Sequence, residues 1–193
     1  WEWEIQYGEA TVTKYKGSDA EVTIPNTIGT GYQVTKIGNR TFEDNKTLEK
    51  VYIPSTVTSI GQSAFSGCSN LQTINGASGV DYIDKFAFAY CSSLESWAIP
   101  SGVEVINDYV FFQCTGLREL TIPDSVTQIK YYAFNGCDSL ATIYFGGEYN
   151  AWVLIDIYNE NGVNDDLVNA TIIYSVPPII ATGVCGAQGD NLD

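Results

Sequence analysis

The residues of this chain that could carry chemistry are its cysteines and its acids, because the sequence contains no histidine. Four of the cysteines follow one another at equal intervals of 23 residues: Cys68, Cys91, Cys114 and Cys137. Zinc sites of the paired-cysteine kind need Cys-x-x-Cys spacing, and a chain without histidine cannot build a Ser-His or Cys-His dyad. The even spacing therefore predicts buried structural thiols that pack like small hydrophobic residues.

The acids give the chain a strong negative charge. There are 23 acidic against 9 basic residues, which makes a formal net charge of -14. Such a field repels phosphate backbones and anionic lipid surfaces, so we expect no nucleic-acid partner. The sequence also has no apolar run long enough to cross a bilayer, so we expect no membrane insertion within this segment. A carboxylate pair for glycoside hydrolysis stays open, which keeps a carbohydrate-active enzyme as one alternative.

One acidic stretch, Asp156 to Asp166 (D-I-Y-N-E-N-G-V-N-D-D), has the oxygen ligands that calcium prefers. It departs from the EF-hand pattern, because Tyr158 occupies the third position and Asn161 stands where the turn glycine belongs. A solvated loop is the favoured interpretation, and ion binding is its alternative. We expect no catalytic residues, no metal and no cofactor.

The interval between the cysteines is the period of most of the chain. Three further columns step by the same 23 residues: Ile37, Ile60, Ile83, Ile106 and Ile129; Phe42, Phe65, Phe88, Phe111 and Phe134; Leu48, Leu71, Leu94, Leu117 and Leu140. A fixed period of this length is typical of a solenoid, in which each repeat buries its apolar side against its neighbours.

Each repeat predicts the same local structure. The pattern L-x-x-Φ-x-Φ, where Φ is apolar, predicts a strand with alternate side chains inward, and S-x-V-x-x-I predicts a second short extended piece. The segment A-F-x-G-C predicts a compact helical or 3₁₀ turn. The repeats cover residues 22–142, and a surface loop is expected at Gly29 to Gln33 of the first. The third repeat has Gly76 to Gly79 (G-A-S-G) where others have Ile-Pro, which predicts a local bend or thinning, with a binding notch as the alternative.

The ends of the chain differ from the repeats. Residues 1–21 alternate apolar and polar side chains and predict a two-stranded N-terminal cap. Residues 143–175 predict a C-terminal cap with a short helix and a closing strand. Together these parts form one solenoid over residues 1–175. Residues 176–193 have lost the period and predict a linker or the start of a following module.

The run I-P-S-T-V-T-S-I-G-Q-S-A-F-S-G-C-S-N-L, Ile53 to Leu71, closely resembles the repeats of BspA-like (bacterial surface protein A-like) leucine-rich-repeat proteins. The resemblance covers roughly residues 22–174. It implies a right-handed leucine-rich-repeat solenoid, an α/β repeat rich in short β-strands with short helical or 3₁₀ turns and capped at both ends. It also implies an extracellular or cell-surface bacterial protein that adheres to host or matrix proteins or to other cell-surface proteins.

The strand positions that alternate with the buried ones predict one exposed sheet. Its candidate binding residues are Lys50, Tyr52, Thr73, Asn75, Ser96, Glu119, Thr121 and Tyr144. Tyr52 and Tyr144 are the expected anchors, because aromatic residues are enriched in binding hot spots. The predicted function is a non-catalytic protein-binding or adhesion module, and an architectural spacer in a larger surface protein is the alternative. The oligomeric state and the ligand stay open.

A second aromatic column, Phe86, Tyr109 and Tyr132, also steps by the repeat length. We expect these rings to pack on one another across repeats. A binding stripe is the alternative.

Overall fold

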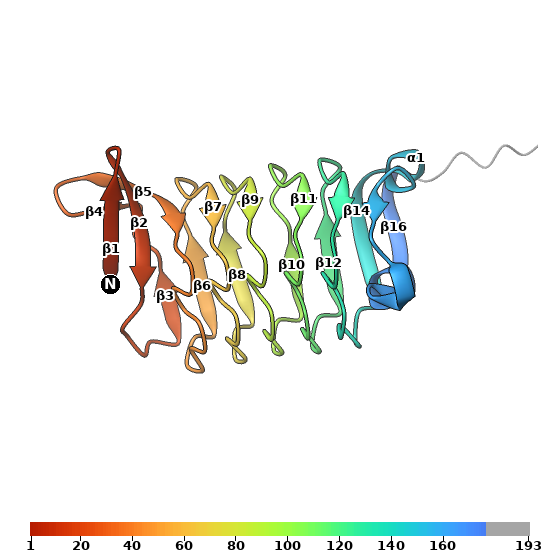
Figure 1. The fold of residues 1–193 in the computed structure, drawn as a ribbon, viewed down its shortest axis with the longest axis horizontal. Coiled ribbons are helices and arrows are strands. Elements are labelled where there is room, and N and C mark those ends of the chain that lie inside the picture. Colours follow the sequence, from red (N-terminus) through yellow and green to blue (C-terminus); the bar gives the residue numbers. More distant parts are fainter. Residues whose placement is uncertain (177–193) are drawn as a thin grey trace, which may run out of the picture.

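The structure, a computed structural model, describes residues 1–176. The chain forms an elongated solenoid, with the N-terminal strands at one end and α1 (Tyr149–Trp152) and β16 (Thr171–Val176) at the other (Figure 1). The prediction of a linker over residues 176–193 lies, from residue 177 onward, outside the described residues.

The strands of successive repeats form two rows. The first row comes from the L-x-x-Φ-x-Φ pattern: β3 (Glu21–Thr23), β6 (Lys50–Ile53), β8 (Thr73–Gly76), β10 (Ser96–Ala98), β12 (Glu119–Ile122), β14 (Thr142–Glu148) and β16. The second row is formed by the shorter extended pieces: β2 (Glu9–Lys14), β5 (Tyr32–Ile37), β7 (Ser59–Ile60), β9 (Tyr82–Ile83), β11 (Val105–Ile106), β13 (Gln128–Ile129) and β15 (Asp156–Ile157). Paired strands within each row run parallel, because a whole repeat of chain separates one strand from the next.

Two antiparallel strands complete the N-terminal end. β1 (Glu2–Gln6) pairs with β2, and β4 (Thr27–Ile28) pairs with β5. The segment predicted as a surface loop at Gly29 to Gln33 is exposed throughout, and it forms the tip and first residues of a hairpin.

Equivalent positions of successive repeats lie side by side in the first row. Leu120 pairs with Trp97 of the preceding strand and with Ile143 of the next, and these side chains are buried. Their neighbours Glu119 and Thr121 point to the other face, because successive side chains of a strand alternate. The alternation predicted from the sequence is confirmed.

The A-F-x-G-C segments are turns rather than the predicted helical or 3₁₀ pieces. They are closed by backbone hydrogen bonds three residues apart, such as Cys68 N–H to the Phe65 carbonyl at 3.1 Å. Tyr90 within one such segment and Phe86 directly before it have φ of 62° and 59°, which a right-handed helix does not contain. Within the described part of the chain, helical segments occur only near its end, at α1, η1 (Glu160–Gly162) and α2 (Asp165–Val168).

The phenylalanine column forms the centre of the core. Phe42, Phe65, Phe88, Phe111 and Phe134 are all at most 2% exposed. Neighbouring rings stack with centroid distances of 4.9, 5.3, 5.9 and 5.3 Å along the column. Each ring is covered by the repeats before and after it, so the apolar side of one repeat is completed only by its neighbours.

The cysteine column lies beside these rings. Cys68, Cys91, Cys114 and Cys137 are free thiols with no exposed surface. Each Sγ donates to the carbonyl oxygen of a phenylalanine in the preceding repeat, at 3.1, 3.3, 3.1 and 3.2 Å respectively. Burial raises the pKa of Cys68 and of Cys114 to about 12, because a thiolate there would be poorly solvated. These are the structural thiols that the spacing predicted.

The first row is not the single sheet that the sequence predicted. It consists of a three-stranded sheet, β3-β6-β8, and a four-stranded sheet that begins at β10. The second row is interrupted at the same level, because β9 ends one sheet and β11 begins the next. We call this level, between β8 and β9 on one side and β10 and β11 on the other, the interrupted junction.

Three features explain why the strands separate there. Gly76 replaces the buried isoleucine of other repeats, and both Gly76 and Ala77 have left-handed φ, 79° and 64°, which ends β8. Trp97 on β10 is the largest residue of its column. Its indole packs against Phe88 of the preceding repeat at 5.0 Å, closer than against Phe111 at 6.1 Å. The Phe88–Phe111 distance of 5.9 Å is also the longest in the phenylalanine column. The indole thus occupies the space between the two repeats.

The interrupted junction is held together on its turn side. Backbone hydrogen bonds run from Phe86 N–H to the Asp108 carbonyl at 3.1 Å, and from Phe88 N–H to the Val110 carbonyl at 3.0 Å. In the second row the Asn107 side chain donates to the Ile83 carbonyl at 2.7 Å, at a position where other repeats use a backbone N–H. The solenoid is therefore continuous in packing even where its sheets stop.

A first prediction concerns the phenylalanine column. Phe111→Ala should lower the free energy of unfolding by about 3–5 kcal/mol, because it leaves a cavity between two repeats that cannot collapse onto it. Phe112→Ala, at a half-exposed neighbouring position, is the matched control and should cost clearly less. Denaturant melts measure both variants. A loss of less than about 1 kcal/mol in the free energy of unfolding for Phe111→Ala would contradict the claim that the buried phenylalanine column stabilises the fold.

A second prediction concerns the thiols, tested in a Cys185→Ser background because Cys185 lies outside the described residues. Iodoacetamide should leave all four buried thiols unmodified in the folded protein and should alkylate them after unfolding, because the thiolate is the reactive form. Alkylation of the folded protein should stay slow at about pH 9, since the raised pKa keeps the thiols protonated there. Mass spectrometry counts the modified residues. Native-state alkylation at the rate of a free cysteine would contradict the burial.

A candidate binding surface on the first row of strands

The residues predicted to line an exposed sheet all lie on the outward face of the first row. Register places them in two lines across the strands: Lys50 beside Thr73 and Ser96 beside Glu119 in one, Tyr52 beside Asn75 and Thr121 beside Tyr144 in the other. None of the eight side chains is buried. The interrupted junction separates Lys50, Tyr52, Thr73 and Asn75 from Ser96, Glu119, Thr121 and Tyr144.

Tyr52 and Tyr144 have the largest side chains among the candidate binding residues on this face. Tyr52 on β6 is 41% exposed and Tyr144 on β14 is 40% exposed. The positions between them in the same line are smaller: Asn75, Ala98 and Thr121. Large rings at both ends and small side chains in the middle give the face a depressed centre.

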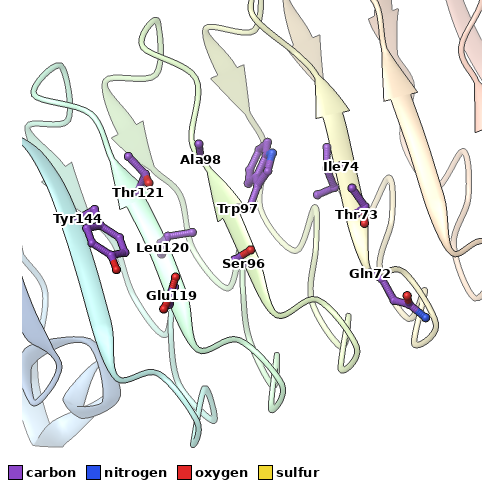
Figure 2. A pocket seen from close by; sticks show the side chains of 10 residues that line it. All are labelled: Gln72, Thr73, Ile74, Ser96, Trp97, Ala98, Glu119, Leu120, Thr121 and Tyr144. Carbon is purple, nitrogen blue, oxygen red and sulfur yellow. The ribbon is translucent and has the colours of Figure 1, made fainter.

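That centre contains a hollow of about 370 Å³, which we call the sheet hollow (Figure 2). It extends from β8 across β10 and β12 to Tyr144 on β14. Its lining residues are Gln72, Thr73, Ile74, Ser96, Trp97, Ala98, Glu119, Leu120, Thr121 and Tyr144. Of the predicted binding residues, Thr73, Ser96, Glu119, Thr121 and Tyr144 line it, whereas Lys50, Tyr52 and Asn75 do not.

The charges on this face are unevenly placed. The Lys50 ammonium pairs with Glu21 Oε1 at 2.9 Å, and its hydrogen bond and attraction to that carboxylate raise the Lys50 pKa. Glu119 is exposed, and within residues 1–176 its carboxylate makes no ion pair or side-chain hydrogen bond. The sheet hollow therefore contains one free carboxylate and no basic side chain.

A second hollow, of about 470 Å³, lies at the same junction on the second row. It is lined by Asp81, Tyr82, Gly102, Glu104, Val105, Asn107 and Lys130. Lys130 Nζ donates to Asn107 Oδ1 at 3.0 Å, and the same Asn107 amide bridges to Ile83. Sequence reasoning missed Asn107, although Asn107 is the one asparagine that directly follows an isoleucine of the 23-residue column, and this was the signal that could have found it.

The second aromatic column packs across repeats, as the sequence predicted. Phe86 stacks on Tyr109 at 4.5 Å, and Tyr109 stacks on Tyr132 at 5.2 Å. The rings stay half-exposed, and Tyr131 lies against Tyr132 at 4.1 Å. A side-chain hydrogen bond with Tyr132 raises the pKa of Tyr131 to about 12. Packing accounts for the column without a ligand.

The acidic stretch at 156–166 makes its contacts within the protein. Gln128 Nε2 donates to Asp156 Oδ2 at 3.0 Å, and Gly136 N–H donates to Asp166 Oδ2 at 2.9 Å. Across residues 1–176 no group of three or more His, Cys, Asp or Glu side chains is arranged to hold a metal ion. In the same residues, no helix has the length and apolar character needed to cross a membrane.

Comparison with protein families gives one match. The model described as "BspA type Leucine rich repeat region" matches residues 20–151 in 6 copies. No curated protein sequence matches the chain.

Several solved structures are similar to the chain. A leucine-rich-repeat protein of T. pallidum shares 27% identity with a TM-score of 0.77, covering 91% of this chain and 79% of that one. A leucine-rich cell surface protein from Faecalibacterium prausnitzii A2-165 shares 30% identity with a TM-score of 0.57, covering 74% of this chain and 52% of that one. The pneumococcal vaccine antigen PcpA shares the fold at 17% identity and a TM-score of 0.62, covering 90% and 48%. The chain thus spans about half the length of the last two.

Proposed function

The chain belongs to the BspA-type leucine-rich-repeat family, and from this premise we propose that it is a non-catalytic protein-binding module of a bacterial cell-surface protein. The observation that carries the proposal is the outward face of the first row, where Tyr52 and Tyr144 flank the polar sheet hollow. Solenoids use such extended faces for binding, since the buried face is fully occupied by packing between repeats.

The residues on this face suit recognition of a protein better than catalysis. Tyrosine gives a large contact area with few rotatable bonds, and it is enriched in binding hot spots. The hydroxyl and amide groups of Thr73, Asn75, Ser96 and Thr121 supply adaptable hydrogen bonds around the hollow. Neither an activated nucleophile nor a pair of close carboxylates lines the sheet hollow among the described residues.

The proposed partner is a host or matrix protein, or another cell-surface protein. An extracellular or cell-surface location is supported by the F. prausnitzii relative, which is described as a leucine-rich cell surface protein. We further infer a right-handed solenoid over residues 1–175, capped by residues 1–21 and 143–175. The antiparallel β1–β2 hairpin at one end, and the burial of Leu167 on α2 near the other, support the inference of caps.

The proposal predicts that Tyr52→Ala combined with Tyr144→Ala weakens attachment to immobilised extracellular-matrix proteins by about tenfold or more, because hot-spot aromatics carry most of the energy of an interface. The melting temperature should change little, since both rings are exposed. Surface plasmon resonance and thermal melts measure the two effects.

Tyr7→Ala is the matched control, because Tyr7 is 96% exposed and lies on the β1–β2 turn, away from this face. It should bind like the parent. Equal binding by the double variant would refute the proposed face. An architectural spacer, the rival function, predicts no saturable binding by the parent itself, and a carbohydrate-active enzyme predicts turnover of a glycan that the double variant retains.

A further inference from the structure

We propose that the sheet hollow receives an arginine side chain of the partner protein. The inference rests on the proposed binding face and names the chemistry of the group that enters it. Two features of the hollow lead to an arginine, an unpaired carboxylate and a ring wall, and the backbone groups left without partners offer contacts for the main chain of the same partner segment.

The backbone groups come from the interrupted junction. At other junctions of the first row, one carbonyl oxygen accepts two successive N–H groups of the next repeat. Glu49 O accepts from Gln72 and Thr73 at 2.8 and 3.2 Å, and Glu95 O accepts from Arg118 and Glu119 at 2.8 and 3.2 Å. The equivalent acceptor at the interrupted junction is Gln72 O, and its equivalent donors are the N–H groups of Glu95 and Ser96.

In the described part of the chain, no backbone hydrogen bond joins Gln72 O to either group. Gln72 and Ser96 both line the sheet hollow. The hollow therefore presents an acceptor, the Gln72 carbonyl, and a donor, the Ser96 N–H, that the regular repeats use internally. Both residues are exposed, so water satisfies these two groups in the free protein, and main-chain groups of a bound partner would replace that water.

The carboxylate is that of Glu119. It lies on β12 beside Ser96, points to the outward face and has no ion-pair partner within residues 1–176. Among the described first-row strands, the one basic side chain is Lys50, which is already paired with Glu21. Arg118 precedes Glu119 in the chain but does not line the hollow. With a net charge of -14 for the whole chain, the field around the hollow attracts a basic group and repels an acidic one.

The ring wall distinguishes arginine from lysine. Tyr144 bounds the hollow on β14, and the smaller side chain of Thr121 lies beside it on β12, the strand that also carries Glu119 (Figure 2). A guanidinium is planar, so it can stack on the Tyr144 ring while two of its N–H groups reach the Glu119 carboxylate on the adjacent strand. An ammonium is a point charge that offers neither a flat face nor two parallel donors. The Gln72 carbonyl, on the far side of the hollow, is left for a main-chain N–H of the partner. The Ser96 N–H remains for a backbone carbonyl of the same partner segment.

The probe is the peptide acetyl-Gly-Gly-Arg-Gly-Gly-amide, and its neutral counterpart carries citrulline in place of arginine. Citrulline keeps the shape of the side chain and removes its charge. In ¹⁵N-labelled protein, the arginine peptide should shift the Ser96 amide and the Trp97 indole N–H with a Kd of about the millimolar range, and the citrulline peptide should not.

Glu119→Gln should weaken binding of the arginine peptide about three- to tenfold, because an exposed ion pair contributes modestly. Asp138→Asn is the matched control, since Asp138 is an exposed acid on a turn and does not line the hollow, and it should bind like the parent. A lysine peptide should bind more weakly than the arginine peptide.

Equal shifts with the arginine and citrulline peptides, unchanged binding by Glu119→Gln, or no shift at Ser96 and Trp97 would each overturn the arginine inference. These outcomes leave the proposed face itself untouched, because that face is tested by the two tyrosine substitutions and whole matrix proteins. Loss of matrix binding in the tyrosine variant together with equal peptide shifts would show a protein-binding face that recognises something other than arginine.

Discussion

The structure depends on one constraint: the apolar side of each repeat is buried only by the repeats before and after it. The stacked phenylalanine rings show this constraint, since every ring in the column is covered by an equivalent ring one repeat away. The thiols follow the same rule, because each one donates to a carbonyl of the preceding repeat. In another protein, regularly spaced cysteines could indicate metal binding or catalysis. In this chain their positions are explained by packing between repeats. The side chains that point outward are not determined by this packing, and the binding face that we propose consists of such residues.

The interrupted junction shows how far this constraint can be relaxed. The absence of a side chain at Gly76 and the bulk of the Trp97 indole separate β8 from β10. The turn side nevertheless keeps its backbone hydrogen bonds, and the Asn107 side chain replaces one backbone hydrogen bond that is missing in the second row. The repeat therefore tolerates a local opening without losing its core. The same opening creates the hollow on the candidate binding face, so an irregularity of packing supplies the feature from which we infer specificity.

Much of the fold and of the candidate binding face could be predicted from the sequence. The remaining features could not, and the reasons are physical. The period places Phe88 and Cys91 in the core and Glu119 and Tyr144 on the surface, because strand alternation fixes the face of each side chain. A local bend or thinning was predicted at Gly76 to Gly79, but not that both rows of strands would split there, because the split depends on the distance between two repeats, which is set jointly by Gly76, Ala77 and Trp97. The left-handed turns at Phe86 and Tyr90 were also missed, since aromatic residues rarely adopt that conformation and the sequence favours a helical turn there.

The central claim is that the regular hydrogen bonding of the solenoid stops at one junction and leaves backbone groups free beside the hollow. Native-state hydrogen exchange tests it most directly, by comparison of Ser96 with Glu119, the equivalent residue one repeat later. The Glu119 amide donates to the Glu95 carbonyl and should be protected, whereas the Ser96 amide has no such acceptor and should exchange much faster. Equal protection of the two amides would contradict the account.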